Sequence, residues 1–265
     1  MVQEMRRLLA RPSRRRARGL WVIEGRRLVE DAGRAGLQVR RLLLAVPRPD
    51  PDALDPAVQA LADRVEAAGG QVYLCSERVA ALLSDTAHPQ GVVALVEGDL
   101  PPLPPTEELE PPVVLLEGVQ DPGNVGTILR SAAAAGAGAV LLDGACADLG
   151  HPKTLRTSAG AMFRVPAARL GEPGGLARVA GALRERGWDV LGLDPHRGRP
   201  YYTQALDGPV ALVVGGEARG ISPELAACCN GFLTIPMARG VESLNVAAAT
   251  AVVLFEVARQ RALRA

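Results

Sequence analysis

The chain has 265 residues, of which 48% are hydrophobic and 22% are charged, and its formal net charge is +1. This composition is typical of a folded globular protein and excludes a disordered or a collagen-like chain. No apolar run reaches the ~18 residues that a membrane-spanning helix needs, and no apolar region follows the arginine-rich N-terminus as it would in a secretory signal. The four cysteines show no metal-ligand spacing, so we expect a reduced, cytoplasmic chain without disulfides or metal.

The charge is unevenly distributed along the chain. Residues 1–41 hold 12 arginines and four acidic residues, a net charge of +8, which leaves −7 for the remainder. A basic end on a mildly acidic body is typical of a segment that binds a polyanion. The basic arm that we expect to make these contacts consists of Arg11, Arg14, Arg15, Arg16 and Arg18.

The first hundred residues alternate between helical and strand-like patterns. Helices are predicted over residues 26–36, 52–68 and 76–83, and strands over 40–46, 71–75 and 91–96. We therefore expect residues 1–97 to form a small α/β domain. Since no segment of it assembles a nucleophile, a base or metal ligands, we expect this domain to bind rather than to catalyse.

A proline-rich segment divides the chain. Residues 97–112 contain six prolines and five acidic residues, a composition that excludes a helix interior and a central strand. We interpret residues 98–112 as a linker and 113–265 as a second domain.

The second domain shows short apolar strands alternating with helices. Strands are predicted over 113–116, 139–142, 190–193, 210–214 and 232–235, and helices over 126–136, 153–159, 176–186, 222–228 and 245–261. Strands buried on both faces and separated by helices predict a parallel α/β sheet. In such sheets the loops at the carboxyl ends of the strands hold the ligand.

Two familiar nucleotide motifs can be rejected. Gly136 and Gly138 follow a helix and precede a strand, which is the reverse of a dinucleotide fingerprint, and this disfavours a nucleotide-dependent oxidoreductase. Gly215, Gly220 and Ser222 have the spacing of a P-loop, but isoleucine stands where its lysine must be. The loop can still bring backbone groups close to a ligand, although a plain tight turn is the alternative.

Polar residues recur where these loops enter helices. Each has a simpler interpretation without a ligand. Asn124 and Ser243 could serve merely as helix caps, and Arg130 could be merely a solvated charge on a helix. The single lysine, Lys153, lies with Arg156 at the entry to the second predicted helix. Each residue is a weak signal alone, but their shared position at the strand ends indicates one site.

Three segments resemble the signature motifs of the SpoU/TrmH family of RNA ribose 2′-O-methyltransferases, in the SPOUT class. They read EGVQDPGNVGTILRSAAAAG (117–136), HPKTLRTSAGAMFRVP (151–166), and VVGGEARGIS (213–222) followed by IPMARGVESLNVAAATAVVLFE (235–256). The N-terminal segments WVIEGRRLVEDAG (21–33) and LSDTAHPQGVVALV (83–96) are similar to the ribosomal-protein-like substrate-binding domain that precedes many of these enzymes.

The resemblance implies a fold, a cofactor and an assembly. The expected fold is a parallel-sheet methyltransferase domain with a C-terminal trefoil knot, preceded by a small α/β RNA-binding domain. The expected assembly is a homodimer with its active site near the interface, and the C-terminal helix, with Val252, Val253, Leu254 and Val257, is a candidate interface unless these residues are ordinary core. The implied cofactor is S-adenosylmethionine, bound by Gly215, Gly216, Glu217, Gly220, Ile235, Pro236, Met237, Ser243, Leu244 and Asn245.

The resemblance also assigns catalytic roles. The catalytic arginine of the family corresponds to Arg130, either as a base or, since arginine hardly ever loses its proton, as a group that grips phosphate and stabilises the developing alkoxide. Asn124 would orient Arg130 or the ribose. The remaining implied residues are Glu217, Ser243 and Asn245, which would complete the pocket, and Lys153 and Arg156, which would contact RNA phosphates.

The expected substrate is 23S rRNA, since family members with this N-terminal domain mostly modify large-subunit RNA. A site that confers resistance to a ribosome-targeting antibiotic is one form of this hypothesis. The alternatives are a tRNA 2′-O-methyltransferase and a non-catalytic RNA-binding or ribosome-assembly factor on the same fold.

Overall fold

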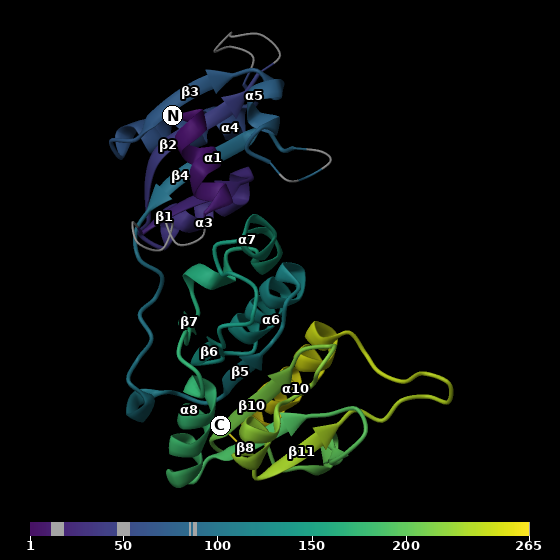
Figure 1. Cartoon of the computed structure of the whole chain (residues 1–265). Coiled ribbons are helices and arrows are strands. Elements are labelled where there is room, and N and C mark those ends of the chain that lie inside the picture. Colours follow the sequence, from purple (N-terminus) through teal and green to yellow (C-terminus); the bar gives the residue numbers. More distant parts are fainter. Residues whose placement is uncertain (12–18, 47–53, 85, 87–88, 265) are drawn as a thin grey trace. The chain divides into compact units, whose positions relative to one another are not determined.

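The structure is a computed structural model that describes residues 1–11, 19–46, 54–84, 86 and 89–264. The chain forms two compact units, which are described separately (Figure 1). The first unit contains Met1–Leu100 and Gly150–Phe163, and the second contains Pro101–Leu149 and Arg164–Ala265. None of the helices in the described part of the chain combines the length and the apolar character needed to cross a membrane.

The first unit is built on a four-stranded mixed sheet in the order β1-β4-β2-β3. The strands β1, β4 and β2 pair antiparallel, whereas β3 pairs parallel to β2. Their bounds are β1 Leu20–Glu24, β2 Gln38–Ala45, β3 Gln71–Cys75 and β4 Val92–Glu97. The α/β character expected from the sequence is confirmed, but β1 was not among the predicted strands.

Helices cover both faces of this sheet. On one face, Met5 and Leu8 of helix α1 pack against Val22, Leu43 and Val93. Because side chains alternate along a strand, the neighbouring buried residues of these strands point to the other face, where α3 and α4 contact the sheet. In the described part of the unit the helices are α1 Val2–Ala10, α3 Arg26–Arg34, α4 Pro56–Ala67, α5 Glu77–Ala81 and α7 Pro152–Ser158, with a 3₁₀ turn at Ala161–Phe163.

The second unit contains a seven-stranded sheet in the order β7-β6-β5-β10-β8-β11-β9. Every neighbouring pair is parallel, so the predicted parallel sheet is confirmed. The bounds are β5 Val113–Glu117, β6 Ala139–Leu142, β7 Ala167–Arg169, β8 Asp189–Leu193, β9 Arg199–Pro200, β10 Val210–Gly215 and β11 Gly231–Thr234. The edge strands β7 and β9 were not predicted, because two or three residues are too short to show a pattern.

Two pairs of helices enclose this sheet. Helices α8 Gly175–Glu185 and α9 Pro223–Ala227 share a core with Val113, Leu115 and Val213. Helices α6 Pro122–Ala134 and α10 Val246–Ala262 pack together and cover the other face.

Burial in α10 corrects the candidate interface. The side chains of Val253, Leu254 and Val257 are completely buried, so these residues belong to the core of the unit, as the alternative interpretation held. Val252 is partly buried, whereas Phe255 is 52% exposed. Phe255, rather than the three buried residues, is therefore the apolar side chain that α10 offers to another molecule.

The C-terminal half of the predicted linker is packed against the second unit. It contains a 3₁₀ turn, Thr106–Glu108, whose Thr106 and Glu107 carbonyls accept hydrogen bonds from the Arg186 guanidinium at 2.5 and 2.6 Å. Leu109, just after the turn, is buried in the core beside α8. The C-terminal half of the predicted linker is therefore part of the folded second unit.

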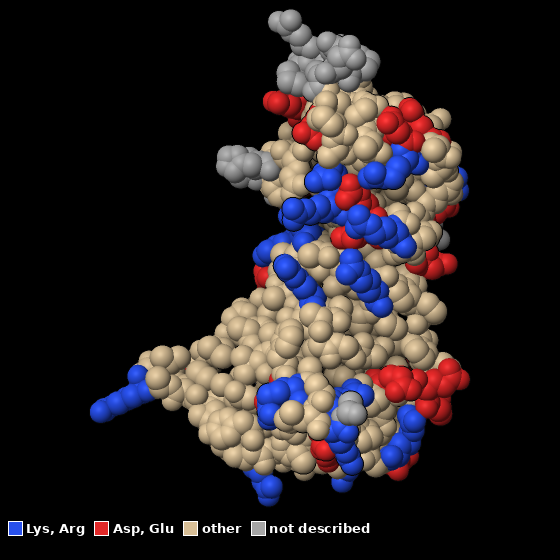
Figure 2. All heavy atoms as spheres, turned by 180° about the vertical axis from the view of Figure 1, so that it is seen from behind, with Lys and Arg blue, Asp and Glu red and all other residues tan. Residues whose placement is uncertain are grey.

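Charged side chains are distributed differently over the two units. On the face of the molecule in Figure 2, the first unit carries many basic side chains with acidic ones between them. A broad part of the second unit carries no charged side chain on that face (Figure 2).

The packing of α1 leads to a prediction about stability. Met5 is completely buried, so the substitution Met5→Ala should lower the free energy of unfolding by about 2–5 kcal/mol. The matched substitution Gln3→Ala, on the exposed face of the same helix, should change it by no more than about 0.5 kcal/mol. Urea unfolding measures both, and equal, small effects would mean that α1 is not part of the core.

Candidate active site

Three of the predicted site residues form a chain of hydrogen bonds between three loops. Asn124 lies in the first turn of α6, after β5; Glu217 follows β10; and Asn245 precedes α10. The Asn245 Nδ2 donates to Asn124 Oδ1 at 3.0 Å, and Asn124 Nδ2 donates to the Glu217 carboxylate. We call this chain the Asn245–Asn124–Glu217 bridge. It joins segments that are 93 and 121 residues apart in the sequence.

The helix caps differ from the simplest interpretation of the sequence. Asp121, not Asn124, caps α6, since its carboxylate accepts the Asn124 backbone N–H at 2.9 Å. Asn245, not Ser243, caps α10, and its Oδ1 accepts the N–H groups of Ala247 and Ala248. The capping interpretation of Asn124 and Ser243 is therefore wrong. One amide, Asn245, serves both the cap and the bridge, because its oxygen and its nitrogen have different partners.

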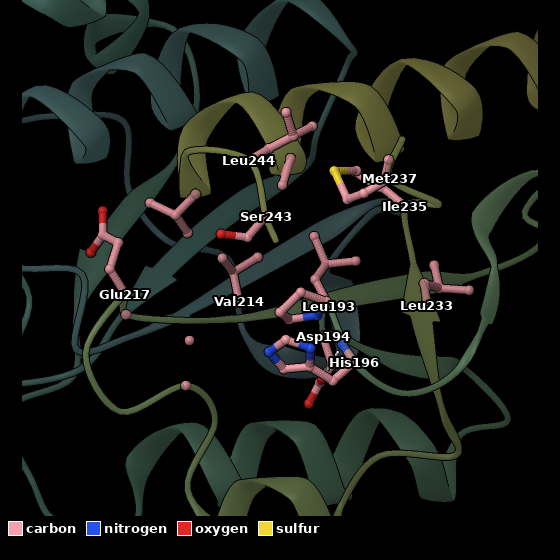
Figure 3. Close-up of a pocket in the computed structure, with 16 residues that line it drawn as sticks. Leu193, Asp194, His196, Val214, Glu217, Leu233, Ile235, Met237, Ser243 and Leu244 are labelled. Atoms are coloured by element: carbon pink, nitrogen blue, oxygen red, sulfur yellow. Dashed lines mark hydrogen bonds between the residues drawn. The ribbon is translucent and has the colours of Figure 1, made fainter. Parts of the chain in front are cut away.

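A cavity of about 340 Å³ lies beside the bridge (Figure 3). Glu217 stands at one end of it, and Met237, Ile235 and Leu233 lie toward the other end. Two residues expected to bind a cofactor, Pro236 and Asn245, do not line it. The expected residues that do line it are Gly215, Gly216, Glu217, Gly220, Ile235, Met237, Ser243 and Leu244.

Glycines are required in one wall of the cavity. A Cβ on Gly215 would come within 2.1 Å of the Gly220 backbone, and one on Gly216 within 2.1 Å of the Gly118 carbonyl oxygen. Gly220 has a positive φ of 64°, which disfavours residues with a side chain. The loop after β10 therefore presents bare backbone to whatever occupies the cavity.

The loop after β8 lines the cavity as well, and the sequence interpretation missed it. Asp194, Pro195 and His196 lie there, and Figure 3 shows His196 at the cavity. The Asp194 carboxylate accepts the backbone N–H of His196 and bonds the Arg197 guanidinium at 2.8 Å. Burial alone would raise the pKa of Asp194, but these hydrogen bonds outweigh it and lower that pKa below its ordinary value. Ligands bind at the loops beyond the carboxyl ends of parallel strands, and this rule, applied to β8, would have predicted the loop.

Arg130 stands apart from the bridge. It is exposed on α6, and six residues of helix separate it from Asn124 by about 9 Å along the axis and about 120° around it. Within the described part of the chain, its guanidinium has no hydrogen-bond or ion-pair partner. Of the five predicted catalytic residues, the fold joins Asn124, Glu217 and Asn245, places Ser243 at the cavity (Figure 3), and leaves Arg130 exposed.

The predicted phosphate contacts fall in the first unit. Lys153 is exposed in the first turn of α7. Arg156 is mostly buried and pairs at 3.8 Å with Glu24, a buried carboxylate that also accepts hydrogen bonds from the Ser84 hydroxyl and the Gln90 N–H. Arg11 is exposed just after α1. The other residues of the predicted basic arm, Arg14, Arg15, Arg16 and Arg18, lie outside the described residues.

The cysteines are free thiols. Cys146 is buried, donates to the Leu116 carbonyl at 3.3 Å and accepts the Val119 N–H. Burial, with the nearby Asp143 carboxylate, raises the pKa of Cys146 to about 12, so this thiol is protonated at neutral pH. Among the described residues, no group of three or more His, Cys, Asp or Glu side chains could hold a metal ion.

The fold and the site define an α/β protein with a ligand cavity at the carboxyl edge of a parallel sheet. Comparison with known families matches residues 111–255 to the SpoU rRNA Methylase family and residues 1–94 to the MRM3-like substrate binding domain. The chain belongs to the SpoU rRNA Methylase family, as the resemblance of its motifs implied.

Individual relatives agree with this assignment. The chain is 36% identical to the 23S rRNA (guanosine-2′-O-)-methyltransferase RlmB of Yersinia pestis, over 80% of this chain and 87% of the relative. It is 31% identical to the 23S rRNA (uridine(2479)-2′-O)-methyltransferase of Streptomyces viridochromogenes, over 98% and 89% of the two chains. The crystal structure of the SpoU methyltransferase AviRb from the latter organism, in complex with AdoMet, superposes with a TM-score of 0.84 at 30% identity, and covers 98% of this chain and 97% of that one.

The double role of Asn245 can be separated by two substitutions. Asn245→Ser keeps a good cap residue but cannot reach Asn124, so stability should stay near wild type while the affinity for S-adenosylmethionine falls about 3- to 10-fold, the range for one hydrogen bond. Asn245→Ala should lose the cap as well, at a cost of about 1 kcal/mol in stability. Calorimetric titration and thermal unfolding measure the two effects. Wild-type affinity in the serine variant would mean that the bridge does not support the cavity.

Proposed function

We propose that this protein transfers a methyl group from S-adenosylmethionine to a ribose 2′-hydroxyl of 23S rRNA. The observation that carries the proposal is the Asn245–Asn124–Glu217 bridge beside the glycine-walled cavity, in a chain of the SpoU family. The relatives named above, which act on 23S rRNA, support the substrate class. Because one of these relatives modifies a guanosine and the other a uridine, the proposal does not extend to the base.

The cavity suits S-adenosylmethionine in size and chemistry. Its volume of about 340 Å³ falls within the range of about 300–1,000 Å³ for small-molecule sites. Ile235, Met237 and Leu244 offer apolar surface for an adenosine, and the backbone of the loop after β10 offers hydrogen-bonding groups. Glu217 supplies a negative charge on the wall, which favours a cationic ligand. When bound, the cofactor supplies an electrophilic methyl group on a sulfonium.

Arg130 would act on the RNA rather than on the cofactor. A ribose hydroxyl is a weak nucleophile, so its proton must be taken or its developing charge stabilised. Since arginine remains protonated in proteins, we assign Arg130 to a phosphate next to the target ribose and to the developing alkoxide. Its exposure, and the absence of a partner for it among the residues that the structure describes, leave the guanidinium available for this role.

We also propose a homodimer formed by the second unit, with the active site near the subunit interface. Two observations support it. Arg130 is exposed on α6 and does not line the cavity, so a site that includes it extends over the surface of the unit. Apolar side chains are exposed at Phe255 of α10 and at Val241 and Leu244 in the loop before it, and exposed apolar patches mark contact surfaces. We further propose that the second unit contains the trefoil knot of the family. We also propose that the protein is cytoplasmic, because 23S rRNA is found there.

The domain boundaries are proposed as 1–97 for substrate binding, 98–112 for the linker and 113–265 for the methyltransferase domain. The match of residues 1–94 to a substrate binding domain supports the first boundary. Segment 150–163 groups by its contacts with the first unit, so the methyltransferase sequence contributes α7 to that unit.

Labelled S-adenosylmethionine tests the proposed reaction. The protein is incubated with protein-free 23S rRNA and, in parallel, with bulk tRNA. We expect label on the rRNA only. Label on tRNA alone would mean that the substrate is tRNA and not 23S rRNA. No label on either RNA, with no cofactor binding by calorimetry, would favour the non-catalytic RNA-binding factor.

Substitution of Arg130 tests its role. Arg130→Ala should lower the rate of methyl transfer about 100-fold or more, the usual cost of losing one charge-stabilising group, and should leave cofactor affinity unchanged. Arg178→Ala, which removes an exposed arginine of α8, serves as the control and should have no effect on the rate. An equal loss of transfer and of cofactor binding in Arg130→Ala would indicate a structural role instead.

A further inference from the structure

We propose that the exposed face of helix α1 is the surface with which the first unit binds the phosphates of RNA. This inference rests on the proposed function for the identity of the RNA. It adds a surface that the basic arm alone does not include, and it excludes the opposite face of the same unit, formed by α3 and α4.

Helix α1 is amphipathic, and its outer stripe is basic. Met5 and Leu8 are buried to 0% and 2% exposure and fasten the helix to the sheet. The exposed residues of the helix, Gln3, Arg6, Arg7 and Ala10, recur at the spacing of one helical face, and Arg11 is exposed at the residue that follows the helix. Because the buried side chains hold the helix in place, the guanidinium groups of Arg6 and Arg7 stand on a rigid support.

These three arginines are not neutralised by the protein. Within the described part of the chain, Arg6, Arg7 and Arg11 have no carboxylate within ion-pair distance. The single acid of the helix, Glu4, is engaged by Arg41 of β2 at 2.7 Å. The outer stripe of α1 therefore carries the positive charges of Arg6 and Arg7, and Arg11 adds a third at the residue that follows the helix.

The opposite face of the unit is different. Arg26 and Arg64 both pair with Glu30 at 3.1 Å, and Arg34 pairs with Asp31 at 3.1 Å. Helix α4 adds the acidic residues Asp63 and Glu66. Among the described residues Arg27 of α3 is exposed without such a pair. The four arginines of α3 and α4 nevertheless share these helices with four acidic residues, so this face offers RNA little net attraction.

The chain continues from α1 directly into the predicted basic arm. Residues 6–18 contain seven arginines, and no acidic residue occurs between Glu4 and Glu24. Arg6, Arg7 and Arg11 are thus the described beginning of one uninterrupted basic stretch. The charge on α1 is continuous in sequence with that of the arm.

The chemistry of this stripe fits phosphate rather than bases. A guanidinium makes paired hydrogen bonds to phosphate oxygens, whereas recognition of unpaired bases usually uses aromatic stacking. Helix α1 has no aromatic residue. The stripe should therefore position the RNA without selecting its sequence.

The test uses the full-length chain with protein-free 23S rRNA as the probe. One variant combines Arg6→Gln, Arg7→Gln and Arg11→Gln. The matched control combines Arg27→Gln, Arg34→Gln and Arg64→Gln, which removes the same charge from the α3 and α4 face. RNA affinity is measured from low to high salt, and thermal unfolding verifies that both variants are folded.

The α1 variant should bind RNA about 100-fold more weakly at 0.1 M salt, and the slope of log affinity against log salt should fall by about 2, since each lost phosphate contact accounts for about 0.7. The control should keep most of the affinity and slope. Cofactor affinity should be unchanged in both variants, and the control should also keep the wild-type rate of methyl transfer.

If the α1 variant kept the RNA affinity and the salt dependence of the wild type, the proposal that this surface binds RNA would be wrong. An acidic protein would then be the alternative partner of the stripe. Equal losses in the two variants would overturn the proposal too, because they would indicate a general effect of charge. In both cases methyl transfer by the wild-type protein would leave the proposed function standing. A wild-type protein that bound no RNA would overturn both.

Discussion

The candidate site depends on one chain of hydrogen bonds, the Asn245–Asn124–Glu217 bridge. A parallel sheet brings the carboxyl ends of β5, β8 and β10 to one edge, but it does not determine how the loops beyond that edge lie. The bridge ties the start of α6 to the loop after β10 and to the start of α10. With Asp121 capping α6, the Asn124 side chain can use both its oxygen and its nitrogen between the loops. The bridge thus positions the glycine turn that forms a wall of the cavity.

Much of this architecture could be predicted from the sequence because it follows from local patterns. Central strands such as Ala139–Leu142 are short apolar runs between helices, and the structure reproduces them within a residue or two. Helix α1 was missed because its arginines obscure a short amphipathic period, although Met5 and Leu8 carry the buried face. The exposed position of Arg130 and the pairing of Arg156 with Glu24 depend on tertiary packing, which no spacing in the sequence encodes.

The two units divide the physical tasks. In the second unit, a cavity with one wall of bare backbone and two carboxylates in its lining, those of Glu217 and Asp194, suits a small cationic ligand. In the first unit, exposed arginines on α1 suit a polyanion, whereas acidic partners neutralise the arginines of α3 and α4. The same residue type therefore serves binding in one place and packing in another, and only its partners in the fold distinguish the two uses.

A double-mutant cycle on the bridge tests the account most directly. The affinity for S-adenosylmethionine is measured by calorimetry for the wild type, Asn124→Ala, Asn245→Ser and the double variant. If the two amides act through their mutual hydrogen bond, their effects will be non-additive, with a coupling energy of about 0.5–3 kcal/mol. Additive effects, with a coupling energy near zero, would contradict the claim that the bridge organises the site.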